Sequence, residues 1–278
     1  MSTIPVVERR GARMPALGFG TFRMSGDTVR HMVENALEIG YRHIDTAQIY
    51  GNEREVGRAI ATSAVPRDEL FVTTKVWVDR FEPRDLRASV QESLERLATS
   101  YVDLLLLHWP AFPGGAMRPT LEALMEVKRA GHATHIGVSN FNIAQLREAE
   151  SVCGDALVTN QVEYHVYLGQ NRLKAAMDQM GYVTTAYLPL ARGRVAQDET
   201  LAEIGRRYGK TAAQVALRWL VEQDGVAAIP ATTKPARCRE NFEIFDFALT
   251  GDDRARVTAL TADVRLCSPS ELAPRWDD

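Results

Sequence analysis

The sequence is poor in cysteine, in long apolar runs and in excess charge of either sign. Its three cysteines, Cys153, Cys238 and Cys267, form no CxxC pair, and their odd number argues against a secreted disulfide framework. No apolar run approaches the ~20 residues that a membrane-spanning helix needs, and the amino-terminal residues lack the apolar region of a secretory signal. A formal charge of −3 gives no electrostatic reason to expect a nucleic acid or a membrane as a partner. We therefore expect a cytoplasmic enzyme or an enzyme-like protein.

The overall composition is that of a globular protein. Apolar residues make up 45% of the chain and charged residues 25%, close to the average for folded domains. The length of 278 residues fits either two average domains or one large α/β barrel. A chain of this length buries enough surface to need neither disulfides nor a structural metal.

Short apolar runs of strand type alternate with helical segments along the whole chain. The runs are mostly continuous rather than alternating, which is typical of parallel strands that are buried on both faces. Between them, apolar residues recur at helical spacing, and Thr211, Pro235 and four glycines supply the expected helix starts and stops. The predicted strands cover residues 16–21, 42–46, 70–75, 102–108, 134–139, 157–162, 183–188 and 226–230.

Eight strands with helical crossovers and no linker between them predict a single (β/α)8 TIM barrel that spans residues 1–278. In such a barrel the active site lies at the carboxyl-terminal ends of the strands. The alternative is an open, doubly wound sheet. The glycine-rich fingerprint of that fold is incomplete here, because Gly18-Phe-Gly20 continues as Thr21-Phe22-Arg23 and the third glycine is missing.

Three potentially charged side chains, Asp45, Lys75 and His108, each end an otherwise apolar strand. A buried ionised group is costly unless it is paired, so we expect these strand ends to converge and the charges to neutralise one another. Taken alone, each residue could simply be a polar group that is satisfied at its strand end.

Tyr50 follows Asp45 by five residues, on the loop after the predicted strand. A free phenol has a pKa of about 10, which is too high for efficient proton transfer near neutrality. A neighbouring Lys75 ammonium would lower that pKa, and a carboxylate would keep the lysine charged. Tyr50 could then donate a proton to a carbonyl oxygen as negative charge develops there.

Six motifs together resemble the aldo-keto reductase superfamily, and the resemblance covers essentially the whole chain. The segment TAYLPLARGR at 185–194 and the closing residues are most similar to the bacterial 2,5-diketo-gluconate reductase B type. The motifs are GFGTF at 18–22, HIDTAQIYGNE at 43–53, TTKVW at 73–77, LLLLHWP at 104–110, GVSNF at 137–141 and NQVEYH at 160–165.

The resemblance implies an enzyme that reduces aldehydes and ketones to alcohols with NADPH, NADH being possible. Tyr50 would be the general acid, Lys75 its partner, Asp45 the partner of Lys75, and His108 would orient the substrate carbonyl. Small-molecule carbonyl compounds would be the substrates, among them α-dicarbonyls such as 2,5-diketo-gluconate or methylglyoxal. A monomer is the expectation for the quaternary state.

The same resemblance assigns residues to the nicotinamide half of the cofactor. Tyr187 would stack on the ring, while Ser139, Asn140 and Gln161 would hold the carboxamide. Arg192 could reach the pyrophosphate or be solvated, and Arg194 likewise. Further cofactor contacts would come from the ends of the strands and the loop after the stacking tyrosine, namely from Gly20, Thr21, Asp45, Leu188 and Leu190.

The segment after the last strand would hold the adenosine half of the cofactor. Pro235 is placed to be the first residue of a helix, whose free N–H groups and positive dipole end suit a phosphate. By resemblance, Arg237 would bind the 2′-phosphate with help from Thr232, Thr233 and Lys234, and Glu240 and Asn241 would contact adenine. Ala231 stands where many members have a lysine, which leaves the strength of the preference for NADPH open.

Phe22, Trp77 and Trp109 each lie next to a predicted site residue, so they could line the substrate pocket together with His108. Packing at the barrel rim is the alternative for each aromatic residue. No metal site is expected, because His132 and His135 have no acidic or cysteine partner in their pattern. Two other functions remain open: a lyase that uses Lys75 as a Schiff-base nucleophile, and a cofactor-binding barrel without catalytic activity.

Overall fold

The computed structural model describes residues 4–112 and 117–277, and its centre is a sheet of eight parallel strands in the order β10-β9-β8-β7-β6-β5-β4-β3. The sheet closes on itself, because the Gly18 N–H donates to the Ala228 carbonyl (2.9 Å) and the Ala228 N–H donates to the Ala16 carbonyl (2.9 Å). The predicted barrel is confirmed, and the open sheet is wrong. The strands are β3 (Phe19–Gly20), β4 (His43–Asp45), β5 (Phe71–Val76), β6 (Val102–Leu107), β7 (Ala133–Ser139), β8 (Leu157–Glu163), β9 (Val183–Tyr187) and β10 (Val226–Ala228).

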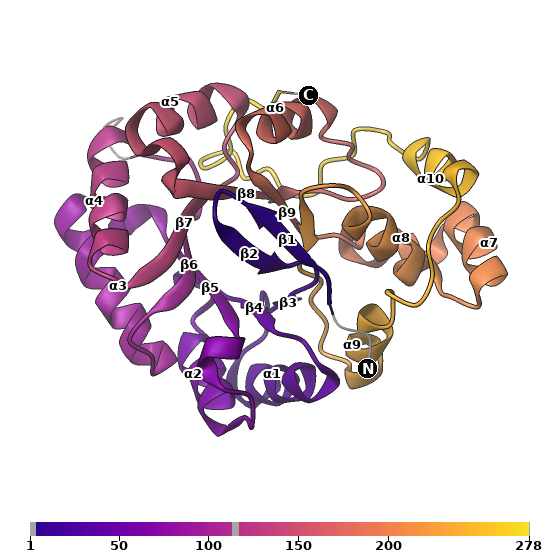
Figure 1. Cartoon of the computed structure of the whole chain (residues 1–278), viewed down its shortest axis with the longest axis horizontal. Coiled ribbons are helices and arrows are strands. Elements are labelled where there is room, and N and C mark those ends of the chain that lie inside the picture. Colours follow the sequence, from indigo (N-terminus) through magenta and orange to yellow (C-terminus); the bar gives the residue numbers. More distant parts are fainter. Residues whose placement is uncertain (1–3, 113–116, 278) are drawn as a thin grey trace.

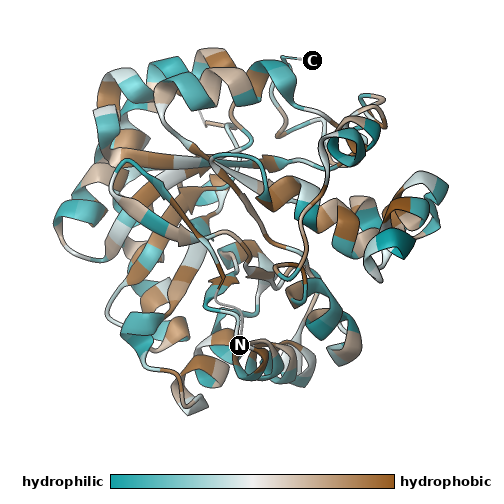
Figure 2. Cartoon of the chain, turned by 45° about the vertical axis from the view of Figure 1, so that its right-hand side comes forward, coloured by the Kyte–Doolittle hydropathy of each residue, from teal (hydrophilic) through white to brown (hydrophobic). Residues whose placement is uncertain are grey.

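Helices surround the strands on the outside (Figure 1). Thr211 forms the predicted capping box with Gln214, and Pro235 is the first residue of α9. Figure 2 shows that hydrophobic and hydrophilic residues alternate along the outer helices, as expected for helices that pack one face on a sheet. They are α1 (Gly26–Ile39), α2 (Glu53–Thr62), α3 (Pro83–Leu97), α4 (Met117–Arg129), α5 (Ile143–Cys153), α6 (Asn171–Met180), α7 (Glu199–Tyr208), α8 (Ala212–Val221), α9 (Pro235–Phe242) and α10 (Gly251–Thr258).

An antiparallel hairpin of β1 (Val6–Arg9) and β2 (Ala12–Pro15) precedes the barrel and was not predicted from the sequence. It lies across the ring of strands (Figure 1). Its buried Ala12 and Met14 belong to one apolar cluster with Phe71 and Val183, the first residues of β5 and β9. The hairpin therefore plugs the amino-terminal end of the barrel.

The strands alternate between the barrel interior and the surrounding helices. In β6, Leu104 and Leu106 belong to the inner cluster, whereas Leu105 and Leu107 pack in the larger cluster that includes the helices. Both faces are thus buried, which explains why the strands read as continuous apolar runs. Among the residues described, no helix is long and apolar enough to cross a membrane.

Candidate active site

The ends of β4 and β5 bring three of the predicted residues together. The Lys75 ammonium donates to Asp45 Oδ1 (2.5 Å), to the Thr46 carbonyl (2.9 Å) and to the Tyr50 hydroxyl (3.3 Å). Lys75 and Asp45 are almost completely buried, with exposed side-chain fractions of 0% and 2%. The predicted convergence of these groups is confirmed.

His108 follows β6 and completes the cluster. Its ring lies edge-on to the Tyr50 ring, with centroids 5.7 Å apart, and to the Trp77 ring at 5.1 Å. The imidazole Nδ1 is buried without a hydrogen-bond partner in the described structure. The four side chains that the sequence singled out thus meet at the carboxyl-terminal ends of consecutive strands.

Opposing effects keep Lys75 charged. Burial lowers the pKa of Lys75, but Asp45 and then Tyr50 raise it by more, so that the net direction is upward. The side chain therefore remains an ammonium at neutral pH. A neutral amine, which a Schiff-base nucleophile requires, is disfavoured here.

Lys75 lowers the pKa of Tyr50, as predicted, but the net direction is upward. Burial raises the pKa of this phenol above its usual value, and the Lys75 ammonium lowers it by less. The desolvation of a buried phenolate was underestimated from the sequence, where only the neighbouring charge could be inferred. At neutral pH the hydroxyl keeps its proton, which is the form that a general acid needs.

His108 is held in its neutral form. Burial lowers the pKa of this imidazole well below its usual range, and the Lys75 charge lowers it further. A neutral imidazole carries one N–H, so it can donate a single hydrogen bond without adding a second positive charge to the cluster.

Two residues beside Tyr50 that the sequence analysis did not single out hold its loop, which includes η1 (Gln48–Tyr50). The Gln48 side chain accepts from the Trp77 N–H (3.0 Å) and donates to Ser93 on α3 (3.1 Å). Buried Asn52 donates to the carbonyls of Thr21 (3.0 Å) and Met24 (2.9 Å). Their position within HIDTAQIYGNE, on both sides of Tyr50, was the available signal.

The predicted carboxamide-binding residues form one hydrogen-bonded group. The Tyr187 hydroxyl donates to Asn140 Oδ1 (2.7 Å), and Asn140 Nδ2 donates to Ser139 Oγ (3.0 Å). Ser139 donates to the Gln161 carbonyl (2.8 Å), while the Gln161 amide donates to Asp45 Oδ2 (2.8 Å). Asn140 has a φ of 66°, a left-handed conformation of the kind that clusters at binding sites.

Gly20 and Thr21 lie where β3 meets the last strand. A Cβ on Gly20 would lie 3.0 Å from the Ile229 carbonyl oxygen, so the close approach of the two segments favours glycine. The buried Thr21 hydroxyl donates to the Asp45 carbonyl (3.0 Å). Both residues therefore border the cluster that contains Lys75.

The loop after β9 has an unusual backbone. Leu188, Ala191 and Arg192 have φ values of 49°, 48° and 54°. The Arg192 side chain is exposed and donates to the Leu266 carbonyl (2.9 Å). Leu190 is half-buried against the main core. Such strained segments persist where the surrounding structure holds them, often at ligand sites.

The start of α9 carries the residues predicted for the adenosine half. Thr233, Lys234 and Arg237 are exposed, and the two cations form no ion pair within the described part of the chain. Thr232 accepts from the Lys234 N–H (3.2 Å). These features place free positive charge at a helix N-terminus.

The other two adenosine-site candidates are turned toward neighbouring structure. The Glu240 carboxylate accepts from the Thr211 hydroxyl of the α8 cap (2.6 Å). Asn241 is 3% exposed. The structure thus places both residues on α9 but commits the Glu240 carboxylate to α8.

The aromatic residues predicted to line the pocket differ in exposure. Phe22 is 48% exposed and lies against Tyr50, with ring centroids 5.0 Å apart. Trp77 is half-buried beside His108, whereas Trp109 is 5% exposed and packs edge-on to Trp276 at 6.5 Å. Phe22 and Trp77 therefore flank the Tyr50–His108 pair, whereas Trp109 packs against Trp276.

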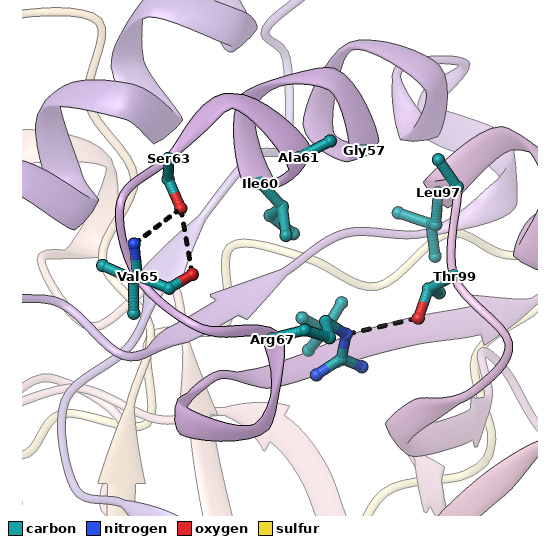
Figure 3. A pocket seen from close by; sticks show the side chains of 10 residues that line it. Gly57, Ile60, Ala61, Ser63, Val65, Arg67, Leu97 and Thr99 are labelled. Atoms are coloured by element: carbon teal, nitrogen blue, oxygen red, sulfur yellow. Dashed lines mark hydrogen bonds between the residues drawn. The ribbon is translucent and has the colours of Figure 1, made fainter.

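A cavity of about 190 Å³ lies apart from this cluster, beside Val72 near the amino-terminal end of β5 (Figure 3). Its Arg67 donates to Thr99 Oγ1 (3.3 Å) and to the Tyr101 carbonyl (2.9 Å), and pairs with Asp103 (2.7 Å). Because these partners engage the guanidinium, the cavity offers no free charged group to a ligand. None of the residues predicted for the active site lines it.

The two histidines considered as metal ligands have other neighbours. His132 contacts the side-chain amide of Gln91, and the His135 ring stacks on Phe71 at 6.5 Å. Within residues 4–112 and 117–277, no group of three His, Cys, Asp or Glu side chains could hold a metal ion.

The fold is a (β/α)8 barrel, and the cluster at its mouth has the composition of an acid–base site. A model of the aldo/keto reductase family matches residues 16–262. The chain belongs to this family, whose members are oxidoreductases that generally use NAD(P)H.

Individual relatives agree with this assignment. Methylglyoxal reductase DkgB of Escherichia coli O157:H7 is 42% identical over 267 residues, which cover 95% of this chain and 99% of the relative. An aldo-keto reductase of Mycobacterium avium (strain 104) is 40% identical over 266 residues, covering 95% and 93%. A crystal structure named as a 2,5-diketo-D-gluconic acid reductase B matches with a TM-score of 0.97 at 50% identity, covering 99% and 98%. The resemblance inferred from the motifs is confirmed.

Proposed function

We propose that this protein reduces aldehydes and ketones to alcohols with NADPH, and that Tyr50 supplies the proton. The observation that carries the proposal is the buried chain Asp45–Lys75–Tyr50, with Nζ 2.5 Å from the carboxylate and 3.3 Å from the phenol. A neutral His108 lies beside the phenol ring. This arrangement offers a protonated hydroxyl and an N–H donor to one carbonyl oxygen.

The residues around Tyr187 fit a nicotinamide dinucleotide. Tyr187 presents an aromatic ring, and Ser139, Asn140 and Gln161 present the donors and acceptors that a carboxamide requires. When bound, a reduced nicotinamide supplies a hydride to the carbonyl carbon. The chain contributes the binding, the orientation and the proton.

The proton transfer follows from the geometry of the cluster. Tyr50 donates its hydroxyl proton to the carbonyl oxygen, which becomes the alcohol oxygen. Lys75, held charged by Asp45, stabilises the phenolate that is left on Tyr50. His108 donates a hydrogen bond that fixes the carbonyl and stabilises the charge that develops on its oxygen.

The preference for NADPH rests on the start of α9. Lys234 and Arg237 are exposed cations beside Thr232, Thr233 and the helix N-terminus, which together suit the 2′-phosphate. By the resemblance to the family, Ala231 stands where many members have a lysine. We therefore propose that NADH is also accepted, but less well.

Small α-dicarbonyl compounds are the proposed substrates. Two relatives carry names that specify methylglyoxal and 2,5-diketo-D-gluconic acid. In this chain, Phe22 and Trp77 place aromatic surface beside Tyr50 and His108, which suits a small, partly apolar carbonyl compound.

A panel of carbonyl substrates tests the proposal, with the absorbance of the reduced nicotinamide followed for NADPH and NADH in parallel. We expect turnover with α-dicarbonyls, and loss of turnover in Tyr50→Phe while NADPH binding is retained. Undiminished turnover in Tyr50→Phe would reject the assigned acid. NADPH binding without turnover on the whole panel would favour a non-enzymatic barrel, and a borohydride-trapped adduct on Lys75 would favour the lyase.

A further inference from the structure

Glu163 is the last residue of β8, and its side chain is completely buried. One carboxylate oxygen accepts from the Leu266 N–H (2.7 Å), and the other accepts from the Cys267 N–H (2.7 Å). The first oxygen also lies 2.9 Å from Nε2 of buried His165. The carboxylate thus joins the barrel to backbone groups more than a hundred residues further along the chain.

A buried carboxylate is costly without donors, so these contacts explain how Glu163 is tolerated. The same contacts also satisfy backbone N–H groups of the carboxy-terminal part of the chain. The residues from 264 to 277, here called the carboxy-terminal segment, contain no helix or strand that could satisfy their backbone. The Val264 N–H also donates to the Tyr167 carbonyl (2.9 Å), and the Arg192 side chain donates to the Leu266 carbonyl (2.9 Å). Glu163 adds a buried carboxylate to these contacts.

The contact lies beside the proposed nicotinamide site. Glu163 and Tyr187 are direct partners in the parallel register of β8 and β9. Burial raises the pKa of the Cys267 thiol, and the neighbouring Tyr187 hydroxyl lowers it by less. Glu163 therefore fixes the backbone of the carboxy-terminal segment at the point where it reaches Tyr187.

The far part of the segment covers another part of the mouth. The Trp276 ring packs edge-on to Trp109, which directly follows His108. The Arg265 guanidinium lies 3.9 Å from the centre of the Trp276 ring, so the two ends of the segment are in contact. At the start of α5, Asn142 donates to the Arg275 carbonyl (3.0 Å) and the Ile143 N–H donates to Asp277 (2.7 Å), so α5 also holds this end. The Arg265–Trp276 contact is the link that connects it to the backbone at Leu266.

We propose that Glu163 is a positioning residue for carbonyl reduction. It holds the carboxy-terminal segment against Tyr187 and above Trp109, and so sets one wall of the pocket that takes the small dicarbonyl substrate. This role rests on the proposed function. Glu163 is not expected to touch the substrate, because its carboxylate is already engaged by Leu266, Cys267 and His165.

Hydrogen exchange of the full-length protein tests the tether directly. In Glu163→Gln, the new amide can accept from only one of the two N–H groups, because its –NH2 faces the other. We expect a peptide containing Leu266 and Cys267 to exchange about tenfold faster than in the wild type. The matched control is Asp103→Asn, which alters a carboxylate that also accepts a backbone N–H, from Val72 (2.9 Å), but far from the mouth.

Kinetics then separate positioning from a general loss of stability. We expect Glu163→Gln to raise the KM for the dicarbonyl substrate about tenfold and to change kcat by less than about threefold, with Asp103→Asn unchanged in both. If Glu163→Gln does not fold, Glu163→Asp provides the same test, since its carboxylate is one methylene too short to reach both amides. Unchanged exchange at Leu266 and Cys267 in the variant that folds would overturn the proposal, as would faster exchange with an unchanged KM. If the wild type shows no turnover, the proposed function fails on its own, whereas the exchange result still decides the tether.

Discussion

The side-chain amide of Gln161 donates a hydrogen bond of 2.8 Å to Oδ2 of Asp45. The other oxygen of the same carboxylate accepts from Lys75 at 2.5 Å. One buried aspartate thus joins the residues proposed to hold the nicotinamide to those proposed to move the proton. A change at Asp45 is therefore expected to disturb both functions.

The coupling between Asp45 and Lys75 can be measured as a free energy of unfolding. Asp45→Asn leaves a buried ammonium without its counter-charge, and Lys75→Met leaves a buried carboxylate, so each should lose about 3–5 kcal/mol. The double variant should lose less than the sum of the two, by about 0.5–3 kcal/mol. Urea denaturation of the four proteins gives the cycle, and additive losses would contradict a direct pair.

Arg237→Ala should weaken NADPH binding about 10- to 100-fold, since it removes a charge-assisted contact with a phosphate. Binding of NADH, which lacks that phosphate, should hardly change. Arg239→Ala is the control, because Arg239 is an exposed arginine on the same helix. Fluorescence titration of both cofactors provides the measurement, and equal losses for NADPH and NADH would rule out the assigned phosphate contact.

Gln48→Leu should lower kcat/KM about tenfold, because it leaves the Trp77 N–H without its acceptor and frees the Tyr50 loop from α3. The side chain keeps a similar volume, so the loss reports on the hydrogen bonds. Gln91→Leu, on the exposed face of α3, should leave kcat/KM unchanged. Steady-state kinetics of the two variants provide the measurement. Equal kcat/KM values for Gln48→Leu and Gln91→Leu would show that other contacts hold the loop.

His43 should make the protein sensitive to mild acid. Burial lowers the pKa of this imidazole to about 4, whereas the unfolded chain takes up the proton near its ordinary value of about 6.5. The contribution of His43 to the free energy of unfolding is therefore fully present above about pH 6.5 and is lost as the pH falls below that value. Between pH 7 and pH 5 the loss from this group should be about 2 kcal/mol.

Unfolding by urea at the two pH values, in the wild type and in His43→Asn, isolates the contribution of His43. The variant should lose about 2 kcal/mol less than the wild type over this interval, because Asn does not titrate. His108 also has a lowered pKa and remains in both proteins, so its effect cancels. The same pH dependence in both proteins would argue against the assignment.

Much of the site could be predicted because its residues interrupt apolar strands. Asp45, Lys75 and His108 each end such a run, and the closure of the barrel converts three separate positions in the sequence into one cluster. The motif around Tyr50 then indicated the residue proposed as the acid. These predictions required only the alternation of strands and helices, together with the cost of burying charge.

Other features depend on information that local sequence does not carry. The polar hairpin of β1 and β2 has no continuous apolar run, so it was missed. The pKa of Tyr50 depends on how completely the fold removes water from the phenol. The donors to Glu163 are backbone N–H groups of Leu266 and Cys267, which every residue except proline possesses.

The hairpin that fills one end of the barrel has a consequence for how the protein can change. Since Met14 and its neighbours leave no way through, reactant and product must share a single entrance at the opposite end. Replacements in the loops around that entrance can thus admit a different carbonyl compound without opening the sealed base. Residues at the open end therefore set substrate selectivity and residues at the closed end contribute to stability, so the two properties can change independently.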